Sequence, residues 1–199
     1  MTLIRYTPDG KKKTCRHCKT KFLPARPMQK ACSPICALAI GREKTKKDAE
    51  KAATADRKVT REKLDAMRTK PQLVALAQKA FNSFIRARDA GKPCICCGKP
   101  LEAGGVGGGF DAGHYRSVGA APHLRFDETN CNGQTKYCNN YLAGNHVAYR
   151  AGLIERIGLR AVELIEADQT LRKYTKEGLI ELAHQYRAMA ASIKGKSSD

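Results

Sequence analysis

The chain contains nine cysteines, and the first four have the spacing of a metal site. Two residues separate Cys15 from Cys18, and Cys32 and Cys36 follow after a gap of thirteen. Four thiolates around Zn²⁺ would let a segment of about twenty-five residues fold with almost no apolar core, because the free energy of metal binding becomes free energy of folding. We therefore predict a structural zinc site here. Free cysteines in a disordered basic segment are the alternative.

A second group of cysteines begins with Cys94 and Cys97, again two residues apart. Cys131 and Cys138 complete a second set of four, which leaves Cys96 unassigned. Six residues separate Cys131 from Cys138, a wider gap than in a standard zinc knuckle. We predict a second structural zinc site with these four ligands, and buried cysteines without a metal are the alternative.

Four polar side chains within the second cysteine group could hydrolyse a phosphodiester bond. That reaction needs a base for the attacking water, a cation for the pentavalent phosphate and stabilisation of the departing oxygen. His114 would be the base, because imidazole has a pKa near neutral pH. Asp111 and Asn139 would offer oxygen ligands to Mg²⁺, with Mn²⁺ as an alternative, and Asn130 would orient His114. Asp111 lies three residues before His114, so a regular strand would point them to opposite faces.

Each of these side chains also has a structural interpretation. His114 could form a surface hydrogen bond, Asn139 could cap a helix and Asp111 could stabilise a turn. Their order within the cysteine frame favours the catalytic interpretation. A cysteine pair, a histidine on a short strand, an asparagine and a Cys-Asn pair resemble the arrangement of HNH (ββα-metal) nucleases. In those nucleases zinc holds a hairpin to a helix and the catalytic metal lies between them.

The elements that must position these residues follow from the hydrophobic pattern. Residues 41–70 have no internal glycine or proline and little apolar stripe, which predicts an exposed charged helix. Apolar residues at helical spacing predict packed helices over 73–85, 147–167 and 175–193. Glycine, asparagine and short apolar runs over 94–145 predict loops and short strands.

The predicted fold class is α+β: a small zinc-stapled ββα-metal (HNH-like) core flanked by helices, with an N-terminal zinc-knuckle module and a long charged helix. Apolar residues make up 42% of the chain, enough for one modest core. The predicted domains are a basic zinc-binding module (1–40), a charged helical linker (41–70), an HNH-like nuclease domain with flanking helices (71–194) and a disordered tail (195–199).

The charge of the chain favours a polyanionic partner. Among 199 residues, 37 lysines and arginines stand against 19 acidic residues, a formal net charge of +18. Residues 1–40 are the most basic part, with nine basic residues and one acidic residue. Nucleic acid is therefore favoured over an acidic membrane surface. The candidate DNA contacts are Lys11, Lys12, Lys13, Arg116 and Arg125.

Two classes of protein are excluded by the distribution of apolar residues. No uninterrupted apolar run reaches the roughly 18 residues of a membrane span. The first residues, MTLIRYTPDGKKK, lack the apolar region of a secretory signal. We expect a cytoplasmic protein, in which metal ligation explains the cysteines better than disulfides do.

Most of the chain resembles the phage lambda NinG (Rap) family of recombination endonucleases. The motifs that carry the resemblance are NSFIRARD (82–89), PCICCG (93–98), DAGHYR (111–116), AAPHLRF (120–126), CN (138–139), GN (144–145), YR (149–150) and LIERIG (153–158). The N-terminal cysteine pairs and the charged helix also look like that family's layout. DAGHYR with the downstream Ala-Ala-Pro is specific, whereas the cysteine pairs alone are not.

The resemblance implies a Mg²⁺-dependent endonuclease that acts on branched double-stranded DNA such as Holliday junctions, in a bacterial host cytoplasm and a phage or prophage setting. Cutting two strands of a junction would favour a homodimer. The family has a cysteine where this chain has Thr135, so either Cys131 substitutes as ligand or the second zinc site is incomplete. His123 is expected at the surface or on DNA. A zinc-dependent nucleic-acid-binding protein or regulator without catalysis is the alternative function.

Overall fold

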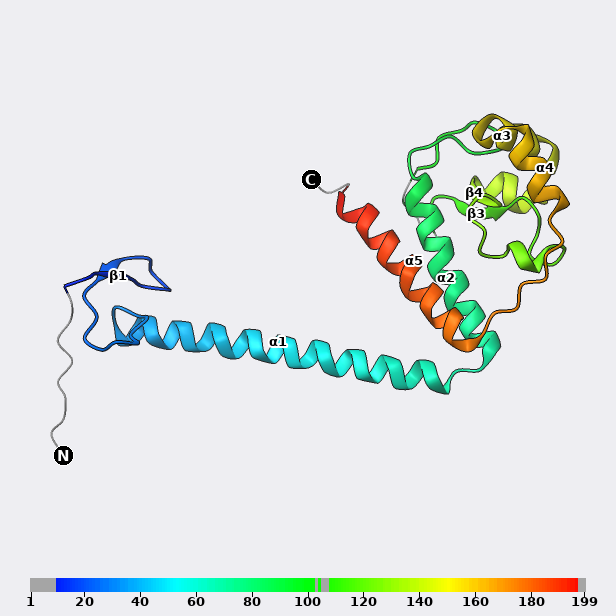
Figure 1. Cartoon of the computed structure of the whole chain (residues 1–199). Coiled ribbons are helices and arrows are strands. Elements are labelled where there is room, and N and C mark those ends of the chain that lie inside the picture. The colour runs from blue at the N-terminus through cyan, green and yellow to red at the C-terminus, as the bar shows by residue number, and fades with distance from the viewer. Residues whose placement is uncertain (1–9, 103, 105–107, 197–199) are drawn as a thin grey trace. The chain divides into compact units, whose positions relative to one another are not determined.

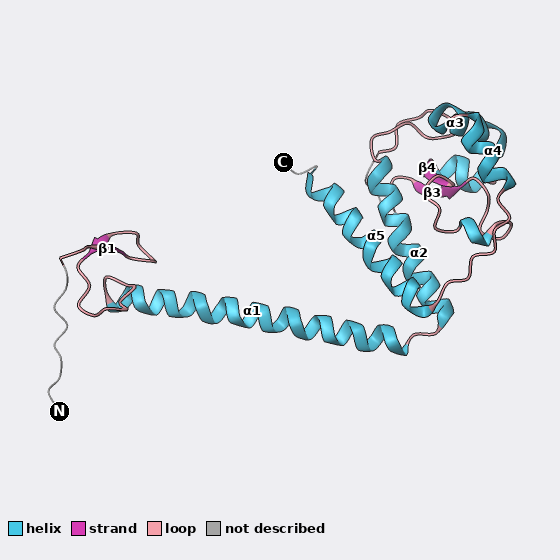
Figure 2. Cartoon of the chain, viewed as in Figure 1, coloured by secondary structure: helices cyan, strands magenta, loops and turns pink. Residues whose placement is uncertain are grey.

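The computed structural model describes residues 10–102, 104 and 108–196, most of them helical (Figures 1 and 2). The chain divides into two compact units, Met1–Ala66 and Met67–Asp199. The first contains β1 (Lys13–Thr14), β2 (Lys21–Phe22) and most of α1 (Pro34–Met67). The second contains α2 (Lys70–Asp89), β3 (Asp111–His114), the 3₁₀ turn η1 (Pro122–Leu124), β4 (Cys131–Gln134), the π-helical turn η2 (Tyr137–Tyr141), α3 (His146–Ile157), α4 (Leu159–Ala167) and α5 (Lys176–Lys196).

In the first unit, a two-stranded ribbon precedes one long helix. β1 and β2 pair antiparallel, and Cys15 follows directly after β1. Ser33 caps α1, because its Oγ accepts a hydrogen bond from the Cys36 backbone N–H at 3.3 Å, and Pro34 suits the first helical position. Cys36 therefore lies in the first turn of α1.

The 34 residues of α1 run without interruption through the predicted boundary at residue 40. Alanine, lysine, arginine and glutamate dominate its sequence and favour a helix. Lys47 Nζ lies 2.6 Å from Glu43 Oε1 in an exposed pair one turn apart. The predicted charged helix is confirmed, but it begins earlier, at Pro34, because Ser33 provides the cap.

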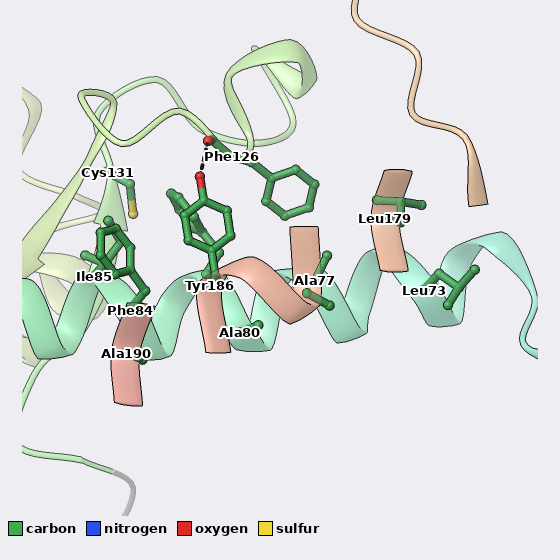
Figure 3. Packing of buried hydrophobic residues seen from close by; sticks show 12 residues of the cluster. Leu73, Ala77, Ala80, Phe84, Ile85, Phe126, Cys131, Leu179, Tyr186 and Ala190 are labelled. Carbon is green, nitrogen blue, oxygen red and sulfur yellow. Dashed lines mark hydrogen bonds between the residues drawn. The ribbon is translucent and has the colours of Figure 1, made fainter. Parts of the chain in front are cut away.

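The second unit is built on the packing of α2 against α5 (Figure 3). A capping box begins α2, in which the Thr69 backbone N–H donates to Gln72 Oε1 at 2.9 Å. Tyr186 of α5 packs among the aromatic rings of α2, and its hydroxyl donates to the Phe126 carbonyl at 3.3 Å (Figure 3). Each large side chain buried here stabilises the fold by about 1.5–3 kcal/mol. The α2–α5 cluster comprises Leu73, Ala77, Ala80, Phe81, Phe84, Ile85, Phe126, Cys131, Leu179, Ala183, Tyr186 and Ala190.

β3 and β4 form an antiparallel ribbon in which Asp111 pairs with Gln134 and His114 pairs with Cys131. Because side chains alternate along a strand, Asp111 and Gln134 share one face of the ribbon, and His114 and Cys131 share the other. The second face packs on α2, since Cys131 belongs to the α2–α5 cluster. The predicted short strands between residues 94 and 145 are confirmed.

The sequence pattern predicts one helix over 147–167, but the structure contains two, which meet at Gly158. Gly158 has a φ of 84°, a left-handed conformation that glycine adopts without strain. The turn allows α3 and α4 to pack against each other, with Tyr149 of α3 and Val162 of α4 buried in one cluster with Leu124. A straight helix of this length could not face one small core along both halves.

The overall class is mixed α+β, mostly helical with two small sheets, in agreement with the predicted class (Figure 2). α5 continues to Lys196, so the predicted disordered tail 195–199 begins with two helical residues. The remaining three, 197–199, lie outside the described residues. Among the residues that the structure describes, no helix has the length and apolar character needed to cross a bilayer.

The carboxylate of Asp89, at the end of α2, is fully buried and connects several parts of the second unit. Its oxygens accept hydrogen bonds from Arg88 at 2.9 and 2.7 Å, from Lys92 at 3.1 Å and from the Gly133 backbone N–H of β4 at 2.8 Å. Arg156 of α3 lies 3.8 Å away. Burial raises the pKa of Asp89, but these partners outweigh burial and hold the pKa below its usual range.

Asp89→Asn is expected to lower the free energy of unfolding by about 2–3 kcal/mol, because a fully buried carboxylate loses its charge and its partly exposed basic partners lose their counter-charge. Urea unfolding followed by circular dichroism measures the change. The control Glu163→Gln, at a half-exposed carboxylate, should change stability by less than about 0.5 kcal/mol.

The stability difference between wild type and Asp89→Asn is expected to depend on pH. Because the folded pKa of Asp89 is depressed, its stabilisation is present above about pH 4 and is lost as the pH falls through the folded pKa. The stability difference between wild type and Asp89→Asn should therefore shrink in acid. A difference that stays constant in acid would contradict the assignment.

Candidate functional site

In the first unit, the sulfur atoms of Cys15, Cys18, Cys32 and Cys36 lie within 4.8 Å of one another. Cys18 Sγ is 3.5 Å from Cys32 Sγ, which is 3.6 Å from Cys36 Sγ. The turn after β1 supplies the first pair, and the second pair comes from the residues that begin α1. All four predicted ligands are brought together, and they could hold zinc.

Backbone N–H groups favour the thiolate form of Cys15. Burial raises the pKa of this thiol, but the N–H groups of Cys32, Cys18 and His17 lower it to about 6. Contacts with the other sulfur atoms raise the pKa of Cys32 to about 12. A divalent cation at the centre would deprotonate the remaining thiols. The donor set therefore fits zinc.

In the second unit, the sulfur atoms of Cys94, Cys97 and Cys138 lie within 4.8 Å of one another. Cys94 and Cys97 come from the turn that follows α2, and Cys138 comes from η2. Burial raises the pKa of Cys94, but the N–H groups of Cys97, Thr135 and Cys96 lower it to about 7. Three of the four predicted ligands meet here, and this cluster could also hold zinc.

Cys131, predicted as the fourth ligand, lies outside this cluster. It is the first residue of β4, and its fully buried side chain belongs to the α2–α5 cluster (Figure 3). The register opposite His114 places it on that face of the ribbon. Burial raises the pKa of this thiol far above its usual range, so it is a neutral apolar side chain. The prediction that Cys131 binds zinc is therefore wrong.

Asp111 and Asn139 meet where β3 approaches η2. Asp111 Oδ2 accepts hydrogen bonds from Asn139 Nδ2 at 3.0 Å and from Asn140 Nδ2 at 3.1 Å. These three residues form the polar corner. Asn139 follows Cys138, so a metal held by the cysteines would also fix the turn that carries both amides. The sequence prediction omitted Asn140, for which the Asn-Asn pair after Cys138 was the signal.

Asn130 is fully buried and holds the connection between β3 and β4. Its Oδ1 accepts a hydrogen bond from the Arg116 backbone N–H at 2.8 Å, and its Nδ2 donates to the carbonyls of Arg116 and Leu124 at 3.0 and 3.3 Å. Arg125 follows Leu124 in the chain, and its backbone carbonyl contacts His114 Nε2. Asn130 thus positions the loop around His114 and makes no contact with the polar corner in the hydrogen bonds described.

His114 lies on the face of the ribbon opposite Asp111, as the spacing of three residues predicts. Its Nε2 is 2.9 Å from the Arg125 carbonyl and its Nδ1 is 3.9 Å from Cys131 Sγ. Nε2 therefore carries the proton. Burial lowers the pKa of His114, so the ring is neutral at pH 7. The structure brings Asp111 and Asn139 together and leaves His114 apart from them.

Two residues predicted near DNA instead contact the end of α4. Arg116 Nη1 donates to the Asp168 carbonyl at 2.6 Å, and His123 Nε2 lies 2.8 Å from the same carbonyl. His123 is buried, so the expectation of a surface position is wrong. The carbonyls that end a helix lack partners within it, which explains these contacts. Arg125 Nη1 donates to Gln78 Oε1 at 3.3 Å, and a DNA contact for either arginine stays a prediction.

Two thiolate clusters, a short ribbon next to a π-helical turn and a basic first unit define an α+β protein with two candidate zinc sites. Over residues 8–195, the chain matches the family described as Bacteriophage Lambda NinG protein. The chain therefore belongs to the NinG family, as the motifs of its sequence predict.

The relatives are proteins of bacteriophages. The chain is 38% identical over 194 residues to Protein ninG of Salmonella phage P22, an alignment that covers 92% of this chain and 93% of the relative. It is 36% identical over 194 residues to Protein ninG of Escherichia phage lambda, covering 92% of each. Protein ninG of Enterobacteria phage H19B is 40% identical over 178 residues, 83% of this chain and 86% of the relative. No solved structure matches the chain.

The purified protein is expected to carry two zinc ions per chain, one for each thiolate cluster. Cys138→Ser should remove one of them, because it deletes a ligand. Cys131→Ala should retain both, because Cys131 lies in the α2–α5 cluster. Elemental analysis after gel filtration measures the stoichiometry. If the Cys131→Ala variant carries only one zinc ion, Cys131 is a zinc ligand after all.

Proposed function

We propose that the chain is a structure-specific DNA endonuclease of the HNH (ββα-metal) type, which cleaves branched recombination intermediates such as Holliday junctions. The observation that carries the proposal is the polar corner, where a carboxylate on β3 meets two amides from the turn after β4. The order of strand, strand and helical turn within a cysteine frame supports the proposal, as does the motif resemblance.

The polar corner offers hard oxygen atoms to a divalent cation. The carboxylate of Asp111 and the side-chain oxygens of Asn139 and Asn140 would hold Mg²⁺ or Mn²⁺, with water completing the coordination shell. Both amides present nitrogen to the carboxylate, and a rotation of their terminal torsions would present oxygen instead. When bound, the cation would neutralise charge on the phosphate and stabilise the departing oxygen.

His114 is the proposed base for the attacking water. The Arg125 carbonyl holds Nε2–H, which leaves Nδ1 without a proton, and the lowered pKa keeps the ring neutral. A base needs this protonation state, and general-base catalysis is typically worth about 10²–10⁴ in rate. Because Nδ1 faces Cys131 on the other side of the ribbon, the proposal requires a local change in strand β3 that brings His114 toward the polar corner when DNA binds.

The position of His114 also favours a second candidate function, a zinc-dependent nucleic-acid-binding protein or regulator without catalysis. In this alternative, His114 only connects β3 to the loop at Arg125. The hydrogen bonds of Asp111 then only hold η2 against the ribbon. Both functions predict DNA binding, so cleavage is the property that separates them.

Positive charge on the first unit supports DNA as the partner in either case. Residues 1–40 have a net charge of +8, from nine basic residues and one acidic residue. Lys11 and Lys12 are exposed, and Lys13 donates to the Pro27 carbonyl. Affinity should fall as salt rises, with a slope of about −0.9 for each duplex phosphate neutralised.

Wild type is expected to cut a labelled four-way junction, but not a linear duplex of the same sequence, in Mg²⁺ and not in EDTA. Asp111→Asn, Asn139→Ala and His114→Ala should each lower the cleavage rate by about 10²–10⁴-fold. The control Glu181→Gln, at an exposed carboxylate of α5, should cut like wild type. Tight junction binding without cutting in any divalent metal would establish the binding protein instead.

Tyr137 and Tyr141 form an exposed aromatic pair on η2, on either side of Asn139. Their ring centroids are 5.9 Å apart with an interplanar angle of 26°, and the residues are 62% and 80% exposed. Exposed aromatic rings stack on unpaired bases, and a branch point that contains unpaired bases would offer such a target. The tyrosine pair therefore offers a way to recognise a branch next to the polar corner.

Replacing both tyrosines by leucine is expected to weaken binding to a junction with unpaired bases at its centre. Stacking is worth about 1–3 kcal/mol for each base, or about 5- to 150-fold in affinity. Fluorescence anisotropy in EDTA measures affinity without cleavage. The double Tyr→Phe variant should bind like wild type, and both variants should bind plain duplex equally. Equal weakening on duplex and junction would contradict branch recognition by this pair.

A further inference from the structure

The thiolate cluster of the second unit has three members, whereas the cluster of the first unit has four. Zinc in proteins is almost always four-coordinate, so three thiolates leave one coordination position to fill. Among the described residues, no other histidine, cysteine, aspartate or glutamate places a ligand atom within reach of Cys94, Cys97 and Cys138 together. The fourth position therefore has no charged protein ligand.

The two remaining cysteines of the second unit are held elsewhere. Cys131 is fully buried on the α2 side of the ribbon. Cys96 Sγ accepts a hydrogen bond from Gln134 Nε2 at 2.9 Å and lies 3.8 Å from the Gly144 carbonyl. The cluster of ligand atoms that lie within 4.8 Å of one another does not include Cys96 Sγ. Neither cysteine completes the site in this arrangement.

Thr135 lies beside two of the three sulfur atoms of the cluster. Its Oγ1 lies 3.9 Å from both Cys94 Sγ and Cys97 Sγ, and it accepts a hydrogen bond from the Cys138 backbone N–H at 3.2 Å. A neutral hydroxyl is a poor zinc ligand, but it can hold a water molecule by a hydrogen bond. Cys97 is exposed, so solvent reaches this side of the cluster.

We propose that zinc in the second unit is bound by three thiolates and one exchangeable water molecule, which Thr135 holds by a hydrogen bond. The zinc–thiolate group then has a formal charge of −1, compared with −2 for the four-thiolate cluster of the first unit. With one position open, incoming ligands and chelators reach this zinc directly, and it exchanges faster than the first. Its loss releases η2, which carries Asn139. The proposal concerns metal binding and does not depend on nuclease activity.

The test is zinc release from the full chain into an excess of a colorimetric chelator, without DNA. Wild type should release two zinc ions in two phases of equal size, and Cys138→Ser should lack the fast phase. Thr135→Cys adds a fourth thiolate to the second cluster and should slow the fast phase, which is release of zinc from that cluster, by at least about tenfold. Removing a group that only contacts a ligand already changes metal affinity about 10- to 100-fold, and a direct ligand should have an effect at least as large. The matched control Cys96→Ser should release zinc like wild type.

Cobalt substitution gives a second measurement that does not depend on rates. Thr135→Cys should raise the thiolate-to-cobalt charge-transfer absorbance by about one part in seven, because the chain then has eight ligating thiolates instead of seven. A single release phase that Thr135→Cys leaves unchanged would overturn the proposal. So would an unchanged cobalt spectrum in Thr135→Cys, loss of the fast-phase zinc in Cys96→Ser, or only one zinc in the wild-type chain.

Discussion

Asp89 ends α2 with a carboxylate that has no access to solvent, and a charge in that position is stable only because basic groups and a backbone N–H surround it. Apart from Arg88 of α2, these groups belong to the cysteine turn, to β4 and, at slightly longer distance, to α3. The close approach of β4 requires Gly133, because a Cβ there would lie 2.4 Å from Leu101 Cδ1 and 3.0 Å from Asp89 Cβ. One buried charge therefore aligns the ribbon with the helices on both sides of it.

In the first unit, where few apolar side chains are buried, cysteine thiolates take the place of an apolar core. In the part of the first unit that the structure describes, the buried cluster comprises Cys15, Ala31 and Cys36, and Phe22, Cys32 and Ile40 pack against it partly buried. Three of these six residues are candidate zinc ligands. Metal binding would therefore supply most of the free energy that folds this segment. In the second unit, Cys138 links the cysteine turn to η2, so the same chemistry holds Asn139 near Asp111. Metal binding and the geometry of the polar corner are coupled through one turn.

The β3–β4 ribbon separates two environments by the alternation of its side chains. Asp111 faces the amides of η2, where carboxylate and amide oxygens could meet a hard cation. His114 and Cys131 face α2, where burial keeps both side chains neutral. The polar corner and the buried α2 face are thus formed by alternating positions on the same strands. Any movement of His114 toward Asp111 would have to change this alternation locally.

The sequence by itself determined the features that depend on local spacing: the four ligands of the first cluster and the helical stripes. Periodicity and short-range turns encode these directly. The order of residue types also pointed to Asp111 and Asn139 as partners, but their contact spans 28 residues and depends on the tertiary structure. Only the tertiary structure decided that Cys131 faces the core, that Thr135 lies beside the second cluster and that Arg116 contacts the end of α4. Each of these depends on which face of the ribbon packs on α2 and on contacts between residues far apart in the chain, and neither appears in a local pattern.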